Sequence, residues 1–405
     1  MHQTYKAELK IAEDACQRLA EDVYYKTIYQ VQKQTGLGFS FSLIDDAAIK
    51  KAMSLKWYGK NYSERIWVNT DRLAEKLKEE LMVNFITGRT NREAAESVQF
   101  EFAKGMQNAR RLVRTESCYL ANQMEMQSYE ECEIEKYRFV ATLDLRTSDI
   151  CRELDGKVFL VSEQQPGKNC PPMHPYCRST TVCDIGEAEL ARMARRARNP
   201  ETGRTETVPA NMTYKQWYDQ KVKGHPDAEL NEKKIKHQSA DKKQYQRYKD
   251  VFKDDAPKTL DDFQNMKYGK PEKWEFVKLD YQRRNELLQH PERKLPNAEN
   301  AILPEPKFTK YLFDKNSKSG YPKGKAFTSR LGYDESNWKK LQQEIRYRST
   351  KYPAQHVDNN GYGDRYVQKM ILYGQKDTPA NVVVAWIKKP DGTVGMTSAY
   401  IKEAK

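Results

Sequence analysis

The sequence predicts a multidomain α+β protein with four successive parts. Residues 1–130 carry apolar residues at intervals of three and four, which is the period of an amphipathic helix. Residues 131–183 and 307–405 contain short runs of alternating or β-branched residues bounded by turn signals, which is typical of strands mixed with helices. Between them, residues 184–306 are polar and broken by Pro-containing turns, so we expect a polar linker with some helix.

Three helices are expected in the N-terminal part. The first has a start signal at Thr70 and a stop signal at Gly88, and its apolar face is made by Ile66, Leu73, Leu77, Leu81 and Phe85. The second follows a capping box at residues 90–93 and runs towards Phe102, and the third spans residues 111–131. Apolar stripes of this kind usually form a core, so we expect a helical bundle.

The pattern changes to strands after residue 137. Residues 138–144 alternate apolar and polar side chains, and residues 157–161 form a short β-branched run after a Gly-containing turn. We therefore expect a small α+β domain over residues 131–183. Within the polar segment that follows, residues 212–222 are typical of a helix that packs through Trp217 and Val222.

A cysteine and histidine knuckle is the most informative motif of this domain. Cys151 is followed by a tight group that consists of Cys170, His174 and Cys177. Thiolates and imidazole at such spacing suit a tetrahedral zinc ion with a structural role. Two other interpretations remain open, namely a knuckle held by Cys151 and Cys177 alone, and plain packing of the Pro171–Pro172 turn.

The residues around this knuckle resemble the head-morphogenesis family of phage Mu F-like minor head proteins. The signature is carried by Arg114, Thr115, Glu116, Asp144, Cys151, Asp155, Gly156, Pro171, Pro172, His174, Cys177 and Arg178. The resemblance covers roughly residues 50–183. It implies a protein of the virion and of the bacterial host cytoplasm that associates with portal and capsid proteins and acts in head assembly and packaging of phage DNA.

The resemblance also bears on the cysteines. A phage head protein assembles in a reducing cytoplasm, which disfavours a disulfide between Cys151 and Cys177 and leaves metal or free thiols. The remaining cysteines are then expected to be reduced and to pack as small hydrophobic residues; they are Cys16, Cys118, Cys132 and Cys183.

The C-terminal part is predicted to be a compact α+β domain over residues 307–405. We expect a turn at residues 315–325, a helix at 335–348, a Gly-rich turn at 358–366 and strands at 367–374, 381–389 and 395–402. The Asp391–Gly392 pair lies between two β-rich runs, which is the strongest short-range signal for a β-hairpin.

Charge is concentrated in this domain. The whole chain has a formal net charge of +13, and residues 307–405 hold 19 Lys and Arg against 9 Asp and Glu, a net +10. Such asymmetry indicates an anionic partner, usually nucleic acid. The sequence contains no run of 18 apolar residues, and its first residues lack the order of a signal peptide, so neither a membrane partner nor a cleaved leader is expected.

Residues 307–402 also resemble a domain found at the C-termini of bacterial and phage polymorphic toxins. The resemblance rests on the YLF start, the run SKSGYPKGKAF, an LGY with a downstream Trp, and the final hairpin. That domain in turn resembles the barnase, EndoU and colicin type of endoribonuclease. It implies an RNA substrate in a bacterial cytoplasm and an immunity protein as partner.

Metal-independent RNA cleavage needs a proton-transfer group and cations or hydroxyl donors for the phosphate. His356 is the only histidine of the domain and is predicted to lie in a polar loop as base or acid. Lys323 and Lys325 are predicted on a Gly-containing loop, with Lys325 or Arg365 holding the phosphate. Hydroxyl groups would come from the last strand, at Thr397, Ser398 and Tyr400, of which Ser398 and Tyr400 share a face.

Several alternatives stay open for the C-terminal domain. A lone loop histidine is often an inert surface residue, and Tyr400 is equally suited to cross-strand packing beside Trp386. A purely structural virion protein would use the basic domain to contact packaged DNA. An ADP-ribosyltransferase toxin is a third class, but the sequence after residue 306 shows no convincing Arg, Ser-x-Ser, Glu-x-Glu series.

Overall fold

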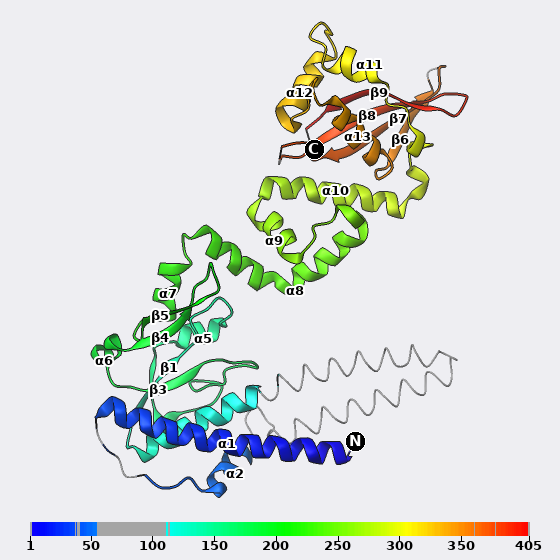
Figure 1. Cartoon of the computed structure of the whole chain (residues 1–405). Helices are drawn as coiled ribbons and strands as arrows, with labels where there is room; N and C mark the ends of the chain where they lie inside the picture. Colours follow the sequence, from blue (N-terminus) through cyan, green and yellow to red (C-terminus); the bar gives the residue numbers. More distant parts are fainter. Residues whose placement is uncertain are drawn as a thin grey trace. The chain divides into compact units, whose positions relative to one another are not determined.

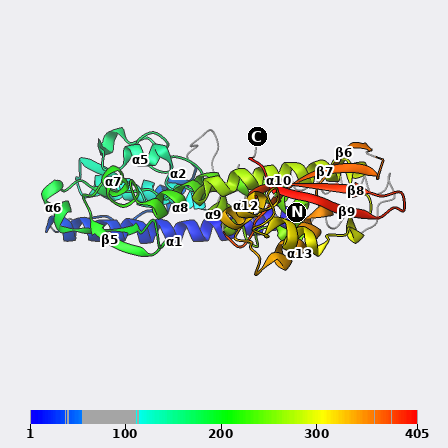
Figure 2. The same ribbon diagram turned by 90° about the horizontal axis from the view of Figure 1, so that it is seen from above.

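The fold was analysed in a computed structural model of the whole chain, shown in two views in Figures 1 and 2. The structure describes residues 2–36, 38, 41–54, 111, 114–359, 361–376 and 378–403. Contacts divide the chain into two compact units, residues 1–232 and 233–405. Both units combine helices with antiparallel sheets, so the predicted multidomain α+β class is confirmed.

Helices of the first unit pack around one apolar cluster. They are α1 (His2–Thr35), α2 (Asp46–Ser54) and a helix over residues 114–131. Buried side chains of all three meet in this cluster, among them Tyr24, Ile28, Ile49, Leu120 and Met124. The third helix confirms the prediction for residues 114–131. The helices predicted at 66–85 and at 90–102 lie outside the described residues.

A three-stranded sheet follows these helices. It contains β1 (Lys136–Val140), β2 (Val158–Leu160) and β3 (Thr180–Cys183) in the order β2-β1-β3, with both pairs antiparallel. The central strand buries Tyr137 and Phe139 completely. Two short helices, α5 (Asp149–Leu154) and η1 (Val161–Glu163), flank β2 in sequence. The strands predicted at 138–144 and 157–161 are therefore confirmed as shorter elements.

The first unit continues past residue 183. It adds α6 (Glu187–Arg192), the hairpin of β4 (Ala194–Arg198) and β5 (Thr205–Pro209), α7 (Tyr214–Lys221) and the start of α8 (Pro226–Phe252). The predicted helix at residues 212–222 is confirmed as α7, because Trp217 and Val222 are fully buried. The hairpin was not predicted, since β4 is rich in Arg and β5 holds two Thr and a Glu, so neither strand shows an apolar run.

The second unit begins with a helical region. After α8 come η2 (Lys253–Asp255), α9 (Leu260–Gly269) and α10 (Pro271–Gln289). These helices bury a largely aromatic cluster that consists of Tyr248, Phe252, Phe263, Trp274 and Val277. The sequence predicts residues 184–306 as a polar linker with some helix; in the structure this segment holds helices and one hairpin.

A four-stranded antiparallel sheet forms the rest of the second unit. Its strands are β6 (Ala354–Asn359), β7 (Asp364–Leu372), β8 (Ala380–Lys388) and β9 (Val394–Ile401), in the order β6-β7-β8-β9. The predicted hairpin is confirmed, because Lys388 pairs with Val394 across the turn. The accompanying helices are η3 (Pro291–Arg293), η4 (Ala298–Asn300), α11 (Glu305–Lys307), the π-helical turn η5 (Phe308–Leu312), α12 (Tyr321–Leu331) and α13 (Trp338–Ser349).

One core holds this sheet and its helices together. It includes Phe308, Phe327, Leu331, Leu341, Ile345, Val382, Val384 and Trp386, all at most 1% exposed. The core also takes in Leu295 and Leu303, upstream of residue 307 where the sequence places the start of the domain. The helix predicted at 335–348 is confirmed as α13.

Two local predictions in this region are wrong. The turn expected at 315–325 gives way to α12 from Tyr321 onwards, so Lys323 and Lys325 lie on a helix rather than a loop. Gly324 is typical of a turn, but here it is a helical residue whose missing Cβ makes room for the Leu312 carbonyl oxygen. His356 was expected in a loop and lies on strand β6.

Candidate functional site

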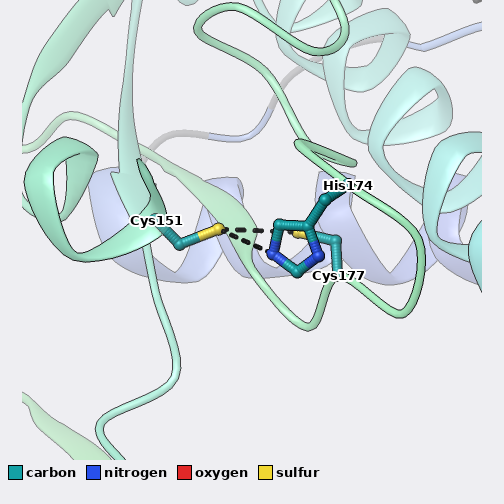
Figure 3. A group of neighbouring side chains, drawn as sticks. All are labelled: Cys151, His174 and Cys177. Carbon is teal, nitrogen blue, oxygen red and sulfur yellow. Dashed lines mark hydrogen bonds between the residues drawn. The ribbon is translucent and has the colours of Figure 1, made fainter. Parts of the chain in front are cut away.

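Three of the four predicted zinc ligands come together in the first unit. Cys151 lies on α5, while His174 and Cys177 lie in the loop that leads to β3 (Figure 3). Cys151 Sγ is 3.5 Å from His174 Nε2 and 3.8 Å from Cys177 Sγ. The donor atoms of all three residues lie within 4.8 Å of one another, so one ion could contact them together.

These separations fit a tetrahedral zinc site. Zn–S bonds of about 2.3 Å and a Zn–N bond of about 2.0 Å place two sulfur ligands roughly 3.8 Å apart and a sulfur and a nitrogen roughly 3.5 Å apart. The distances from Cys151 to its two neighbours agree with both values. Cys151 and Cys177 are nearly fully buried, at 1% and 5% exposure, which suits a closed structural site better than an open catalytic one.

Hydrogen bonds orient the imidazole of His174. Its Nδ1 lies 2.8 Å from the carbonyl oxygen of Pro175, to which a protonated Nδ1 donates. This leaves Nε2, the atom that faces Cys151, unprotonated, so its lone pair can accept the Ser148 hydrogen bond or bind a metal. Ser148 Oγ lies 2.7 Å from the same Nε2 and comes from the residue before α5.

Cys170 does not join this group. It is fully buried in the other apolar cluster of the unit, together with Tyr137 and Cys183. Cys118 instead packs against the cluster that contains Cys151 and Cys177. A hydrogen bond to Cys177, together with burial, raises the pKa of the Cys118 thiol, and the same bond lowers the pKa of Cys177.

Spacing in the sequence could not show that Cys118 lies beside the Cys151, His174 and Cys177 group. It lies on the helix over residues 114–131, far ahead of the knuckle in sequence. Its link to the knuckle is tertiary, since its thiol also lies 3.7 Å from the carbonyl oxygen of Ser179. The only available signal was its place two residues after Glu116, the last residue of the Arg114–Thr115–Glu116 motif.

Other signature residues hold the loop of the knuckle. Arg178 makes a bidentate ion pair with Asp144, with 2.9 Å between Nη2 and Oδ1. Burial opposes ionisation of Asp144, but the hydrogen bonds from Arg178 outweigh it and lower the pKa of that carboxyl. Thr115 accepts a hydrogen bond of 3.2 Å from the main chain of Tyr176 and so ties the helix to the loop.

Asp155 joins three segments of the unit. Its buried carboxylate accepts main-chain hydrogen bonds of 2.6 Å from Ala141 and from Tyr214, and it pairs with Arg195 at 3.1 Å. Gly156 follows with a φ of +82°, a conformation that favours glycine. The Asp-Gly pair of the signature therefore connects β1, the β4–β5 hairpin and α7.

The predicted catalytic residues of the second unit fall into separate groups. His356 Nε2 lies 3.5 Å from Asp364, and its ring packs edge-on against Tyr366. Arg365 makes an exposed ion pair with Asp358 on the neighbouring strand. Lys325 lies over the ring of Tyr321, at 5.1 Å from its centroid.

Ser398 and Tyr400 approach a different cation, Lys323 of α12. Lys323 Nζ lies 3.2 Å from Ser398 Oγ and 5.6 Å from the centroid of the Tyr400 ring. It also donates a hydrogen bond of 3.0 Å to Tyr311 Oη. Thr397 instead donates to the main-chain carbonyl of Ala385 at 3.1 Å.

The sheet keeps His356 apart from this group. His356 lies on β6 and Ser398 on β9, which are the two outer strands of the four-stranded sheet. Three inter-strand spacings of about 4.8 Å separate these strands by roughly 14 Å. The structure therefore does not bring His356 together with the hydroxyl groups of the last strand.

Comparison with known proteins gives a family for part of each unit. Residues 75–182 match the family described as Phage Mu protein F like protein, and this segment contains the whole knuckle. Residues 294–403 match a domain of unknown function, DUF6883. These matches support the resemblance to Mu F-like proteins, whereas the C-terminal match carries no activity with it.

One curated relative is the NAD(+)-arginine ADP-ribosyltransferase EFV of Enterococcus faecalis. It is 27% identical over 150 residues, which are 36% of this chain and 31% of the relative. The chain thus spans about a third of the length of that protein. No solved structure matches the chain. Among the described residues, no helix is both long and apolar enough to cross a membrane.

Proposed function

We propose that the chain is a minor head protein of a phage, which associates with portal and capsid proteins during head morphogenesis and DNA packaging. The observation that carries the proposal is the Mu F-like match over residues 75–182. The geometry supports it, because the signature residues Asp144 and Arg178 pair to hold the loop of the knuckle. Asp155, also of the signature, joins the neighbouring segments around Ala141 and Tyr214. The protein would then be found in the virion and, before assembly, in the host cytoplasm.

A structural zinc ion would hold the knuckle. Cys151, His174 and Cys177 would be its ligands. Cys118, which packs against their cluster and hydrogen-bonds to Cys177, would supply the fourth ligand in place of Cys170. Zinc bound in this way links α5, the loop before β3 and the helix over residues 114–131. Because the cluster around it has only a few apolar residues, the metal would add much of the local stability.

A complementation experiment tests the head function. A phage that lacks this gene is supplied with the wild-type chain, with Cys177→Ser or, as a matched control, with Cys170→Ala. We expect DNA-filled heads with the wild-type and control chains and a marked loss of filled heads with Cys177→Ser. Normal yields of filled heads without any copy of the gene would overturn the proposal.

The second unit would act on RNA. Support comes from its basic composition, with a net charge of +10 over residues 307–405, and from polar groups suited to phosphate and proton transfer. The described residues offer two groups of this kind. One is His356 of β6 beside Asp364 of β7, with Arg365 nearby, and the other is Lys323 beside Ser398 and Tyr400 of β9. An immunity protein would protect the cell that makes the chain.

Two other functions compete for this unit. The basic domain could contact packaged DNA without any catalysis. A toxin of another chemistry is the second alternative, because the chain is similar over 36% of its length to a protein named as an ADP-ribosyltransferase. Expression of the full chain in bacteria separates the three: RNA cleavage on a gel supports the ribonuclease, growth arrest with intact RNA supports another toxin, and normal growth with intact RNA supports the structural role.

A further inference from the structure

The polar group around Lys323 is built by an unusual piece of backbone. Residues Phe308–Leu312 form a π-helical turn, and such turns occur often at functional sites. Tyr311 lies on this turn, and its hydroxyl meets the ammonium group of Lys323, which belongs to α12. The turn and the helix thus present a phenol and a cation to each other.

Two glycines allow the start of α12 to lie close to the π-helical turn. A Cβ on Gly320 would overlap the carbonyl oxygen of Tyr311, and a Cβ on Gly324 would overlap that of Leu312. The first turn of α12 can therefore lie directly against the π-helical turn only because both positions lack a side chain. This close contact sets the 3.0 Å bond between Lys323 Nζ and Tyr311 Oη.

The charges around Tyr311 favour its ionised form. Lys323 donates to its hydroxyl, and Lys307 lies 5.8 Å from the centroid of its ring. The hydrogen bond from Lys323 lowers the pKa of Tyr311 below the usual value for a phenol, with Ser319 contributing a second bond. A phenol held in this way is a better proton acceptor near neutral pH than an ordinary tyrosine.

Lys323 can bind an anionic ligand while it donates a hydrogen bond to the Tyr311 hydroxyl. An ammonium group has three N–H donors, and the bonds to Tyr311 and Ser398 engage two of them. The third is left for an anion. Because Lys323 is part-buried between the rings of Tyr311 and Tyr400, its ammonium group is held in a fixed position.

We propose that Lys323 and Ser398 bind a phosphodiester of single-stranded RNA and that Tyr311 takes the proton of the adjacent 2′-hydroxyl. The O2′ atom then attacks phosphorus, the bond from phosphorus to the 5′-oxygen breaks, and Lys323 gives a proton to that oxygen. The proton on Tyr311 passes to Lys323 through their hydrogen bond, which restores the phenolate and the ammonium group. The products are a 2′,3′-cyclic phosphate and a 5′-hydroxyl. The inference rests on the proposed ribonuclease function. It places the catalytic site where η5, α12 and β9 meet, and not at His356 on β6.

The test measures binding and cleavage of a labelled single-stranded oligoribonucleotide by the full chain. We expect Tyr311→Phe to reduce cleavage by about 10²-fold to 10⁴-fold with little change in binding, as for loss of a proton-transfer group. Lys323→Ala should reduce both, and Lys323→Arg should restore binding but not cleavage. Lys310→Ala removes an exposed charge beside Tyr311 and is the matched control.

The pH profile separates chemistry from folding. Cleavage by the wild-type chain should rise as Tyr311 ionises, and the residual cleavage by Tyr311→Phe should lose that step. Cleavage by both Tyr311→Phe and Lys323→Ala at the wild-type rate would overturn the inference and leave the ribonuclease function standing. Loss of cleavage in His356→Ala alone would return the chemistry to β6, and a wild-type chain that neither binds nor cleaves RNA would overturn both proposals.

Discussion

Asp155 accepts a hydrogen bond of 2.6 Å from the main-chain N–H of Tyr214, so the Asp-Gly turn of the signature and the start of α7 are joined directly. The same carboxylate is fully buried and pairs with Arg195. A buried carboxylate with this many donors organises the backbone around it. Ala141 precedes Asp155 in the sequence and Tyr214 follows it, so this one carboxylate joins separate segments of the first unit.

Replacement of this carboxylate should therefore be costly. Asp155→Ala leaves Arg195 and two main-chain donors without their acceptor, and we expect the first unit to lose about 3–5 kcal/mol of unfolding free energy. Urea unfolding of the full chain measures the change. Glu153→Ala, at an exposed position on α5, is the control, and equal midpoints for the two variants would contradict this role of Asp155.

Zinc content provides the second prediction. The wild-type chain should carry one zinc ion per molecule, and Cys177→Ser should lower both zinc content and melting temperature, because the ligand thiolate is lost. Elemental analysis of purified protein, followed by thermal unfolding with and without a chelator, gives both quantities.

Two further cysteine variants make the zinc experiment specific. Cys118→Ala should weaken zinc binding, while Cys170→Ala should keep the metal, because Cys170 packs in a different cluster. A wild-type chain with well under one zinc would remove the metal centre. Loss of zinc in Cys170→Ala, but not in Cys118→Ala, would restore the ligand set predicted from the sequence.

Glu125 should make the stability of the first unit depend on pH. Burial raises the pKa of Glu125 to about 7, although hydrogen bonds from Thr181 and Thr180 lower it. The folded chain then holds a proton that the unfolded chain releases above its ordinary pKa near 4.3. Stability from this group is fully present below that pH and falls as the pH rises towards 7, by up to about 3 kcal/mol.

Comparison of unfolding free energies from pH 4 to pH 8 checks this sign. Glu125→Gln should be more stable than the wild-type chain at pH 8, and the difference should shrink towards pH 4. Glu130→Gln changes an exposed carboxyl on the same helix and should show no such trend. A difference between Glu125→Gln and the wild-type chain that stays constant with pH would contradict the raised pKa.

The fourth prediction concerns the residue at which the C-terminal domain begins. Asp280 of α10 is 1% exposed and accepts hydrogen bonds from Arg284, Tyr352 and Tyr373. A fragment that starts at residue 294 lacks Asp280 and leaves the hydroxyls of Tyr352 and Tyr373 without this acceptor. We expect residues 294–405 to be several kcal/mol less stable to urea than residues 233–405. Equal stability of the two fragments would contradict the prediction.

The sequence predicts those parts of the fold whose signals are local. The hairpin of β8 and β9, the helices α7 and α13 and the short strands around the knuckle follow from turn residues and apolar periods. Helix α12 was missed because Gly320 and Gly324 resemble turn residues, while their actual role depends on the backbone of residues 311 and 312. Spacing along the chain carries no information about such an approach.

Among the residues of the candidate sites, too, only those with a local signal in the sequence could be predicted. Cys151, His174 and Cys177 could be predicted because the last two share a short loop, whereas Cys118 reaches the site only through tertiary packing. Tyr311 was missed for the same reason, since its significance depends on Lys323 of another helix. Sheet order, which separates His356 from Ser398, likewise cannot be derived from the composition of the strands.

The most direct test of the head function is the protein content of purified phage particles. Particles of the phage that encodes this chain are separated into DNA-filled and empty heads, and peptides from residues 1–232 and 233–405 are counted by mass spectrometry. We predict that filled heads contain the chain in a small, fixed number of copies, with peptides from both units. Its absence from filled heads, with the chain found only in the infected cell, would contradict a minor head protein.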